Sequence, residues 1–228
     1  MDIQPGSAEM ADFRLGTPAL VCRWRLAHGK LPLENRHLRA LSQRVVNGAH
    51  VSPQLVAWAK QHIEWTLGDG TAACPNGVLM LVVDDQGQAA MSVGPYEELG
   101  EKTAAALAAR AKQAAGEGHE TGVAPELLVV VRSGTVVLCA PEGAKVCGAA
   151  TLVLDLSRAF GLEATRDESP AEGLLAADAG ADASAAFDEV FLVSDEHGVV
   201  AATDCSGPVA ERLRAAYDKL LDSMDQRR

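Results

Sequence analysis

Two pairs of short apolar segments, each pair joined by a turn, constrain the fold of this chain more than any other feature of its sequence. The first pair is GVLMLVV (Gly77 to Val83) and AAMSV (Ala89 to Val93), with the turn formers of DDQGQ between them. The second pair is ELLVVVR and TVVLCAP, joined at Ser133-Gly134. Apolar runs of strand length separated by turn residues are typical of β-hairpins. The sequence therefore predicts two hairpins that the rest of the chain has to cover.

Predicted helices alternate with these hairpins. The first begins at Ser52-Pro53, a capping residue followed by proline, and runs to Gly68. One face of this helix carries the apolar residues Leu55, Val56, Ala59, Ile63 and Leu67. Further helices are predicted at 102–118, 149–160, after Ser169-Pro170 and from about 208 to 221, with short strands at 163–165, 189–194 and 199–203. Hairpins interleaved with helices predict an α+β fold.

The stretch GPYEELGE (Gly94 to Glu101) is the best candidate for a domain boundary, because it places turn formers between two patterned regions. We therefore expect a smaller N-terminal α+β lobe at 17–97 and a C-terminal lobe at 98–228. Residues 1–16 are small, polar and aperiodic, and are predicted to be a loose leader. The Ala- and Asp-rich stretch at 176–186 is predicted to be a surface loop.

Composition excludes several classes of protein. Hydrophobic residues make up 48% of the 228 residues, yet no apolar run approaches the roughly 18 residues that cross a bilayer. The first residues also lack the basic and apolar regions of a signal peptide, so we expect a cytoplasmic protein. The formal net charge of -11 argues against nucleic-acid binding, which depends on clustered Lys and Arg.

Common catalytic and metal-binding motifs are missing from the sequence. Its five cysteines are scattered without a C-x-x-C pair, and its six histidines show no H-x-x-x-H spacing, so no metal site is predicted. There is no G-x-S-x-G sequence and no Walker sequence, which argues against the common hydrolases and P-loop proteins.

Three segments in the last third of the chain, in the right order, resemble the class IV (fold-type IV) aminotransferases, which include branched-chain and D-amino-acid aminotransferases and aminodeoxychorismate lyases. They are TLVLDLSRAFGLEATRDESPAEGLL (Thr151 to Leu175), FDEVFLVSDEHGVV (Phe187 to Val200) and SGPVAERLRAAYDKLL (Ser206 to Leu221). The second is similar to the family's A-D-E-V-F-L strand with its phosphate-facing turn, and the third to its closing G-P-V-T helix. The resemblance implies a two-lobed α+β fold, abbreviated in this chain.

A looser similarity reaches further towards the N-terminus. GEKTAAALAARAKQAA, which contains Lys102, looks like the family's K-T-x-x-Y-L helix start. GKLPLE (Gly29 to Glu34) resembles its opening strand, and HLRALS (His37 to Ser42) resembles H-L-x-R-L-x-x-S with a residue missing. By resemblance we expect the cofactor pyridoxal phosphate, a small amino acid or 2-oxo acid as substrate, and a homodimer.

Two residues would carry the cofactor chemistry in this family. A lysine amine is needed to hold the cofactor aldehyde, and the resemblance places it at Lys102. A carboxylate is needed beside the ring nitrogen, and Glu142 stands in a similar E-G-A stretch. The alternatives stay open: Lys102 as a solvated residue of a first helical turn, and Glu142 as an acidic residue of a loop.

The cofactor phosphate is normally held by backbone N–H groups at helix starts and turns. The resemblance places these at Gly148 and Thr151, where the family has G-I-T-R, and at Ser194, where it has T-G-T. Two departures stand out, because Ala149 and Ala150 replace a threonine and an arginine, and Asp195-Glu196 adds two negative charges.

Three functions are therefore open. The first is an aminotransferase dependent on pyridoxal phosphate, in which Lys102 is the catalytic residue and Glu142, Gly148, Thr151 and Ser194 bind the cofactor. The second is a homologue that keeps the fold without the cofactor and serves as a dimeric binding or structural protein. The third is an unrelated α+β domain whose alanine-rich helices are similar by accident.

Overall fold

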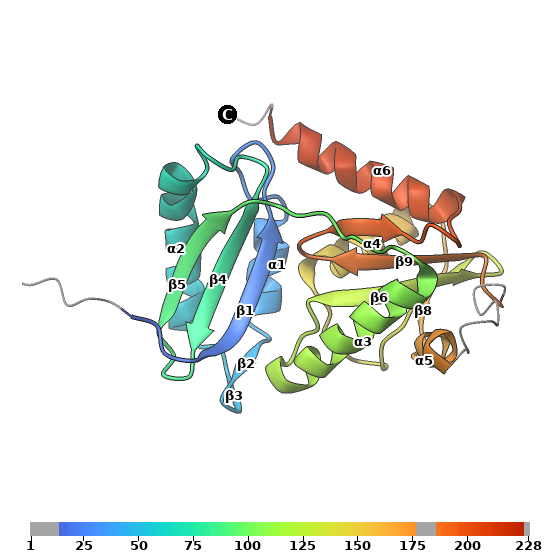
Figure 1. The fold of residues 1–228 in the computed structure, drawn as a ribbon, viewed down its shortest axis with the longest axis horizontal. Coiled ribbons are helices and arrows are strands. Elements are labelled where there is room, and N and C mark those ends of the chain that lie inside the picture. The colour runs from blue at the N-terminus through green and yellow to red at the C-terminus, as the bar shows by residue number, and fades with distance from the viewer. Residues whose placement is uncertain (1–13, 177–185, 226–228) are drawn as a thin grey trace, which may run out of the picture.

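The computed structural model describes residues 14–176 and 186–225, and it arranges them around two separate sheets (Figure 1). We call the elements from Pro18 to Gly94 the first lobe and those from Ala104 onward the second lobe. The predicted leader and the predicted loop at 176–186 lie for the most part outside the described residues.

The first lobe is a three-stranded antiparallel sheet with helices on one side. Its strands follow the order β1 (Pro18–Arg25), β4 (Val78–Asp84) and β5 (Ala89–Gly94). Its other elements are α1 (Glu34–Leu41), α2 (Pro53–Gly70) and a small ribbon of β2 (Val45–Val46) and β3 (Ala49–His50). The predicted hairpin is confirmed as β4 and β5, and the predicted cap of α2 is confirmed because the Ser52 side chain accepts the Leu55 N–H at 3.1 Å. The buried side chains of this lobe come from β1, β4, α1 and α2.

The prediction of an opening strand at Gly29–Glu34 is wrong. The opening strand is β1, eight residues long and ending at Arg25, which pairs with Val78 of β4. Gly29 instead has φ +72° in a turn, and its N–H donates to the Pro75 carbonyl at 2.7 Å. A φ in the left-handed region interrupts a strand, so the chain turns where the similarity suggested an extended segment.

The second lobe is built on a five-stranded mixed sheet. The strand order is β10 (Gly198–Ala201), β9 (Glu189–Ser194), β6 (Glu126–Arg132), β7 (Thr135–Leu138) and β8 (Ala164–Arg166). All pairs are antiparallel except β7 with β8. The second predicted hairpin is confirmed as β6 and β7, and the strand predicted at 189–194 is confirmed as β9.

Helices cover both faces of this sheet. On one face, α4 (Gly148–Ala159) and α6 (Pro208–Ser223) pack on Val129, Phe191 and their neighbours. On the other face, α3 (Ala104–Thr121) and α5 (Ser169–Ala176) pack on Leu128 and Leu192. A sheet buried on both faces requires nearly continuous apolar strands, which explains the ELLVVVR and EVFLVS sequences. The expected α+β class is thereby confirmed.

No helix in residues 14–176 or 186–225 combines the length and the apolar character needed to cross a membrane.

Candidate functional site

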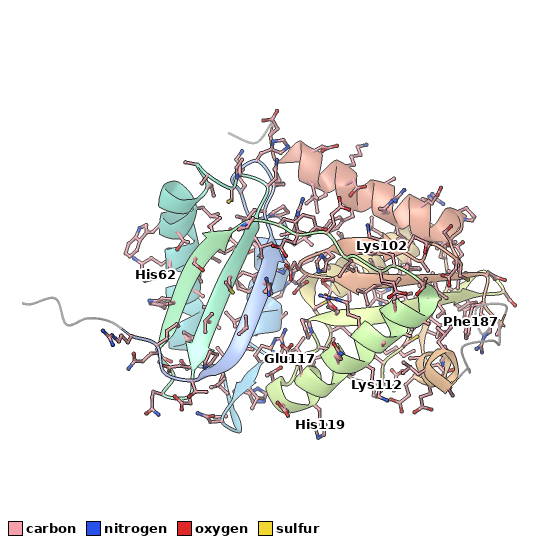
Figure 2. The ribbon with its side chains drawn as sticks, in the orientation of Figure 1. His62, Lys102, Lys112, Glu117, His119 and Phe187 are labelled. Carbon is pink, nitrogen blue, oxygen red and sulfur yellow. The ribbon has the colours of Figure 1, made fainter. Side chains whose placement is uncertain are left out.

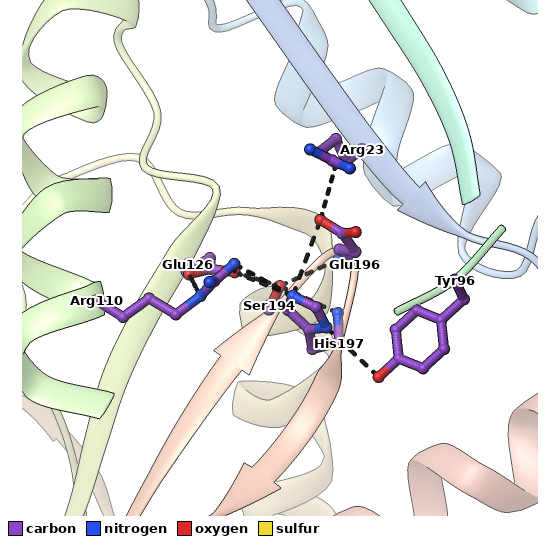
Figure 3. A network of polar contacts seen from close by, with 7 residues as sticks. All are labelled: Arg23, Tyr96, Arg110, Glu126, Ser194, Glu196 and His197. Atoms are coloured by element: carbon purple, nitrogen blue, oxygen red, sulfur yellow. Dashed lines mark hydrogen bonds and ion pairs between the residues drawn. The ribbon is translucent and has the colours of Figure 1, made fainter. Parts of the chain in front are cut away.

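A network of polar side chains lies where the two lobes meet (Figure 3). The centre of the network is the end of β9, with Ser194, and the turn that follows it, with Glu196 and His197. Ser194 pairs in register with Glu126, so the end of β9 and the start of β6 lie side by side. The remaining members are Arg110 from α3, Arg23 from β1 and Tyr96 from the segment that joins the lobes. Three parts of the second lobe, one strand of the first and the segment between the lobes therefore converge.

Glu126 is a buried carboxylate that this network neutralises. The Nε and Nη2 atoms of Arg110 donate to its two oxygens at 2.5 and 2.9 Å, in the bidentate geometry that suits a guanidinium. The Ser194 hydroxyl donates to the same carboxylate at 3.0 Å. A second ion pair joins the lobes, with Arg23 Nε at 3.0 Å from the Glu196 carboxylate. Glu126 and Glu196 therefore each have a cationic partner.

His197 is held in its neutral form inside the network. Its Nε2 lies 3.2 Å from Nη2 of Arg110, and its Nδ1 lies 3.4 Å from the Tyr96 hydroxyl. Burial, and next the charges of Arg110 and Arg23, lower the pKa of His197 to about 4. Because a guanidinium can only donate, Nε2 must be the accepting nitrogen and Nδ1 carries the proton.

Arg25 is the cation of this region without a carboxylate partner. Its guanidinium lies over the Tyr96 ring, 3.4 Å from the ring centroid. Its Nη1 atom is buried and has no hydrogen-bond partner, and no ion pair of Arg25 is found within the described ranges. Burial raises the pKa of Tyr96, against the opposing charge of Arg25, so the phenol stays protonated. The Nη1 atom of Arg25 is thus a buried donor without an acceptor, while the charge of Arg25 also acts on the carboxyls of Glu196 and Asp218.

Two cavities open near these residues. The smaller, about 420 Å³, lies between the lobes and is lined by Arg23, Arg110, Glu126 and Glu196 among others. Arg25 stands two residues from Arg23 on the same face of β1. The larger cavity, about 710 Å³, lies within the second lobe between α3, α5 and the hairpin of β6 and β7. The smaller cavity is the one that the charged network borders.

The structure brings three of the five predicted site residues into one region. Gly148 and Thr151 stand in the first turn of α4, and the turn after Ser194 reaches this helix start through its next residue, Asp195, whose Oδ1 accepts the Ala149 N–H at 2.7 Å. The two hydroxyls already have partners. Thr151 donates to the Gly148 carbonyl at 2.7 Å, and Ser194 donates to the buried glutamate of the network.

The other two predicted residues come from other segments of the chain. Lys102 precedes α3, where its Nζ lies 3.3 Å from the Glu98 carboxylate (Figure 2). Glu142 is an exposed turn residue beside Pro141. Pro141 lines the larger cavity together with α3 residues from Ala111 onward. Ala111 lies about 10 Å along the helix from Ala104, its first residue, at 1.5 Å per residue, so Glu142 and Lys102 stand near different parts of α3. The predicted roles of Lys102 and Glu142 stay predictions.

Sequence reasoning missed the residues that form the network, chiefly Arg25, Arg110, Glu126 and His197. The signal for Arg25 was present, because Val21, Arg23 and Arg25 alternate with apolar residues as in a strand with one polar face. No local signal could pair Arg110 with Glu126, since their contact depends on how α3 lies against the sheet.

Solved structures of other proteins share this fold. The PLP-bound form of a hypothetical aminotransferase from Mycobacterium tuberculosis matches with a TM-score of 0.59 and 15% identity, covering 97% of this chain and 94% of that chain. A 4-amino-4-deoxychorismate lyase from Pseudomonas aeruginosa matches with a TM-score of 0.52 and 18% identity, covering 90% and 91%. The branched-chain amino acid aminotransferase from Escherichia coli matches with a TM-score of 0.54 and 10% identity, covering 92% and 90%.

These matches confirm the fold that the sequence resemblance implied, which is the fold of the class IV aminotransferases and related lyases. The Mycobacterium tuberculosis protein has also been solved in a form bound to alpha-ketoglutarate and PMP, so the expected cofactor is one that this fold carries in solved structures. No protein-family model and no curated protein sequence matches the chain.

Proposed function

We propose that this protein uses an aminotransferase fold to bind a small carboxylate, an amino acid or a 2-oxo acid, between its lobes without pyridoxal phosphate. The observation that carries this proposal is the buried, unpartnered Nη1 atom of Arg25. A buried charged donor without an acceptor costs about 1–3 kcal/mol or more, and an anionic ligand that satisfies it recovers part of that cost. A carboxylate matches the planar fork of a guanidinium.

The charge of Arg25 itself favours a carboxylate over a cation. The adjacent cavity is lined by Arg23 and Arg110 together with the carboxylates of Glu117, Glu126 and Glu196, and neutral His197 adds no charge of its own. The Tyr96 ring holds one face of the Arg25 guanidinium, and Nη1 at its edge is the buried donor that a ligand would have to reach. A structure of the same fold agrees with this ligand class, since the Mycobacterium tuberculosis protein has been solved bound to alpha-ketoglutarate.

The residues present at the expected phosphate turns do not fit the phosphate of pyridoxal phosphate. The Ala149 N–H at the start of α4 already donates to a carboxylate of this chain, Asp195. The hydroxyls of Thr151 and Ser194 are engaged within the protein. A phosphate placed there would stand beside Asp195, and repulsion between like charges disfavours it. These contacts support the cofactor-free function.

The second candidate is an aminotransferase dependent on pyridoxal phosphate, with Lys102 as its reactive amine. Two observations favour it. Neighbouring structures of the same fold contain this cofactor, and the charge of Lys102 contributes to lowering the pKa of His197, so its amine lies within electrostatic range of the network.

Ligand binding tests the main proposal. Calorimetric titration with a set of 2-oxo acids and amino acids, beginning with alpha-ketoglutarate, is expected to find a ligand. The substitution Arg25→Met, which keeps the apolar length and removes the charge, is expected to weaken that binding by about 10- to 100-fold. Arg158→Met changes an exposed arginine of α4 and serves as the control. The proposal fails if no acid in the set binds, or if Arg25→Met binds as tightly as the control.

Trapping with borohydride tests the second candidate. The purified protein is mixed with pyridoxal phosphate, reduced, and mapped by peptide mass. Labelling confined to Lys102 and lost in Lys102→Ala would support the aminotransferase; labelling spread over exposed lysines would count against it.

A homodimer is a further proposal, implied by the resemblance to class IV aminotransferases. Sedimentation equilibrium tests it directly, because a single species with the mass of one 23.8 kDa chain would exclude it.

A further inference from the structure

One buried carboxylate joins the start of α4 to the first lobe. Asp195, only 5% exposed, follows β9 directly. Its Oδ1 accepts the Ala149 N–H at 2.7 Å, and its Oδ2 lies 3.4 Å from Nδ1 of His37 in α1. Its backbone carbonyl also accepts the N–H of Arg25 at 3.0 Å. A single residue of the second lobe therefore contacts two elements of the first.

The start of α4 supplies no anion of its own. The capping residue of this helix, Cys147, makes no side-chain hydrogen bond, and the first turn contains no acidic residue. A helix N-terminus carries unpaired N–H groups and a partial positive charge that an anion stabilises. Asp195 supplies that anion from the turn after β9, 46 residues later in the chain than Ala149.

The space around this helix start is filled by the side chain of His37. The ring of His37 is 2% exposed and stacks on Trp24, with ring centroids 5.3 Å apart. A Cβ atom added at Gly148 would lie 2.8 Å from Nδ1 of His37 and 3.2 Å from its backbone nitrogen. Glycine at this position is therefore explained by the close approach of α1.

The charge state of Asp195 agrees with its contacts. Burial acts to raise the pKa of its carboxyl, but His37, the Ala149 N–H and Arg44 act together to lower it below the usual range. The group is therefore an anion at neutral pH, where a helix N-terminus favours it.

We infer that Asp195 is a built-in anion that occupies the helix start expected to hold a cofactor phosphate, and that together with His37 it fastens the two lobes to each other. This role of Asp195 rests on the proposed cofactor-free function, since Asp195 is the group that takes the place of the phosphate. Ligand binding at Arg25 is a separate property of the protein.

A pair of aspartates provides a matched test. Asp204 accepts the Ala104 N–H at the start of α3 at 2.8 Å, so Asp204→Ala also removes a carboxylate from a helix start, but within the second lobe alone. Asp195→Ala is expected to lower the midpoint of urea unfolding more than Asp204→Ala, because it also removes the contact with His37. If Asp195→Ala does not fold, Asp195→Asn is compared with Asp204→Ala in its place. Asp195→Asn keeps an acceptor for the Ala149 N–H, so it is expected to fold with an unfolding midpoint below that of the wild type.

The second readout is selectivity for phosphate. Equilibrium dialysis of the wild-type protein with pyridoxal phosphate and with pyridoxal is expected to give equal affinities, because no phosphate site is free. Wild-type protein that binds pyridoxal phosphate about tenfold tighter than pyridoxal would overturn the inference. Stability of both Asp195 variants equal to that of Asp204→Ala would overturn it too. The affinity for alpha-ketoglutarate is measured for Asp195→Asn and for Arg25→Met. This affinity tests the proposed function alone, because ligand binding at Arg25 is separate from the role of Asp195, so the two failures can be told apart.

Discussion

The carboxylate of Glu189 accepts the backbone N–H of Ala210 at 2.6 Å, at the start of α6. Its other oxygen accepts the Val209 N–H at 2.9 Å, and Glu189 itself is buried. This contact is the counterpart, at the other end of β9, of the contact between Asp195 and α4.

Glu189→Ala is expected to lower the free energy of unfolding by about 1–3 kcal/mol, because it leaves two N–H groups at the start of α6 without their acceptor. Chemical denaturation measures the loss. Glu172→Ala is the control, since Glu172 is exposed on α5 and is expected to change stability by no more than about 0.5 kcal/mol. Equal effects of the two substitutions would show that the cap contributes little.

The low pKa of His197 predicts a pH dependence of stability. Its pKa is about 4 in the folded protein against an ordinary value of 6.5, so between these values the unfolded chain binds more protons. The contribution of His197 is therefore present above pH 6.5 and is lost as the pH falls through 4. In His197→Gln this contribution is missing, so the variant should lose less stability than the wild type over that range. Urea unfolding at a series of pH values compares the two slopes, and parallel slopes would contradict the prediction.

Gly198, the first residue of β10, follows His197 with φ +70°, and a Cβ atom there would lie 2.3 Å from the Tyr217 ring. Gly198→Ala is expected to cost about 1–2 kcal/mol for the left-handed backbone and about 1–3 kcal/mol more for the clash. Gly87→Ala is the matched control, because Gly87 has φ +78° and open space around its Cβ position. A loss in Gly198→Ala no larger than in Gly87→Ala would refute the role of Tyr217.

Arg110→Ala removes the bidentate partner of buried Glu126. We expect a loss of about 1–3 kcal/mol, at the lower end of the range for buried charge pairs because the Arg110 side chain is 40% exposed. Arg158→Ala removes an exposed arginine paired with Asp155 and should cost about 0–1 kcal/mol. Thermal unfolding compares the two variants, and a result in which both behave alike would mean that Glu126 finds another partner.

Much of the fold follows from the local sequence. Both hairpins, the α2 cap at Ser52 and the β9 strand were predictable, because turn residues and unbroken apolar runs act over a few residues. The opening strand was misplaced because the Gly29–Glu34 similarity outweighed the alternation of polar and apolar residues in β1.

The candidate site was less predictable. Its central contacts join residues far apart in the chain, such as Glu126 with Ser194, and the register of two strands cannot be derived from either strand alone. The sequence did indicate the importance of Asp195 as an unexpected negative charge. Only the structure gives the partners of that charge, Ala149 and His37.

The position of Asp195 after β9 means that α4 is synthesised before the residue that caps it. When α4 leaves the ribosome, its capping carboxylate lies 46 residues downstream and has not yet been made. At translation rates of about 5–20 residues per second, the helix waits roughly two to nine seconds for Asp195. During that interval α4 lacks its cap, and of the strands it packs against only β6 and β7 have been made, so its apolar face stays partly uncovered until β9 follows.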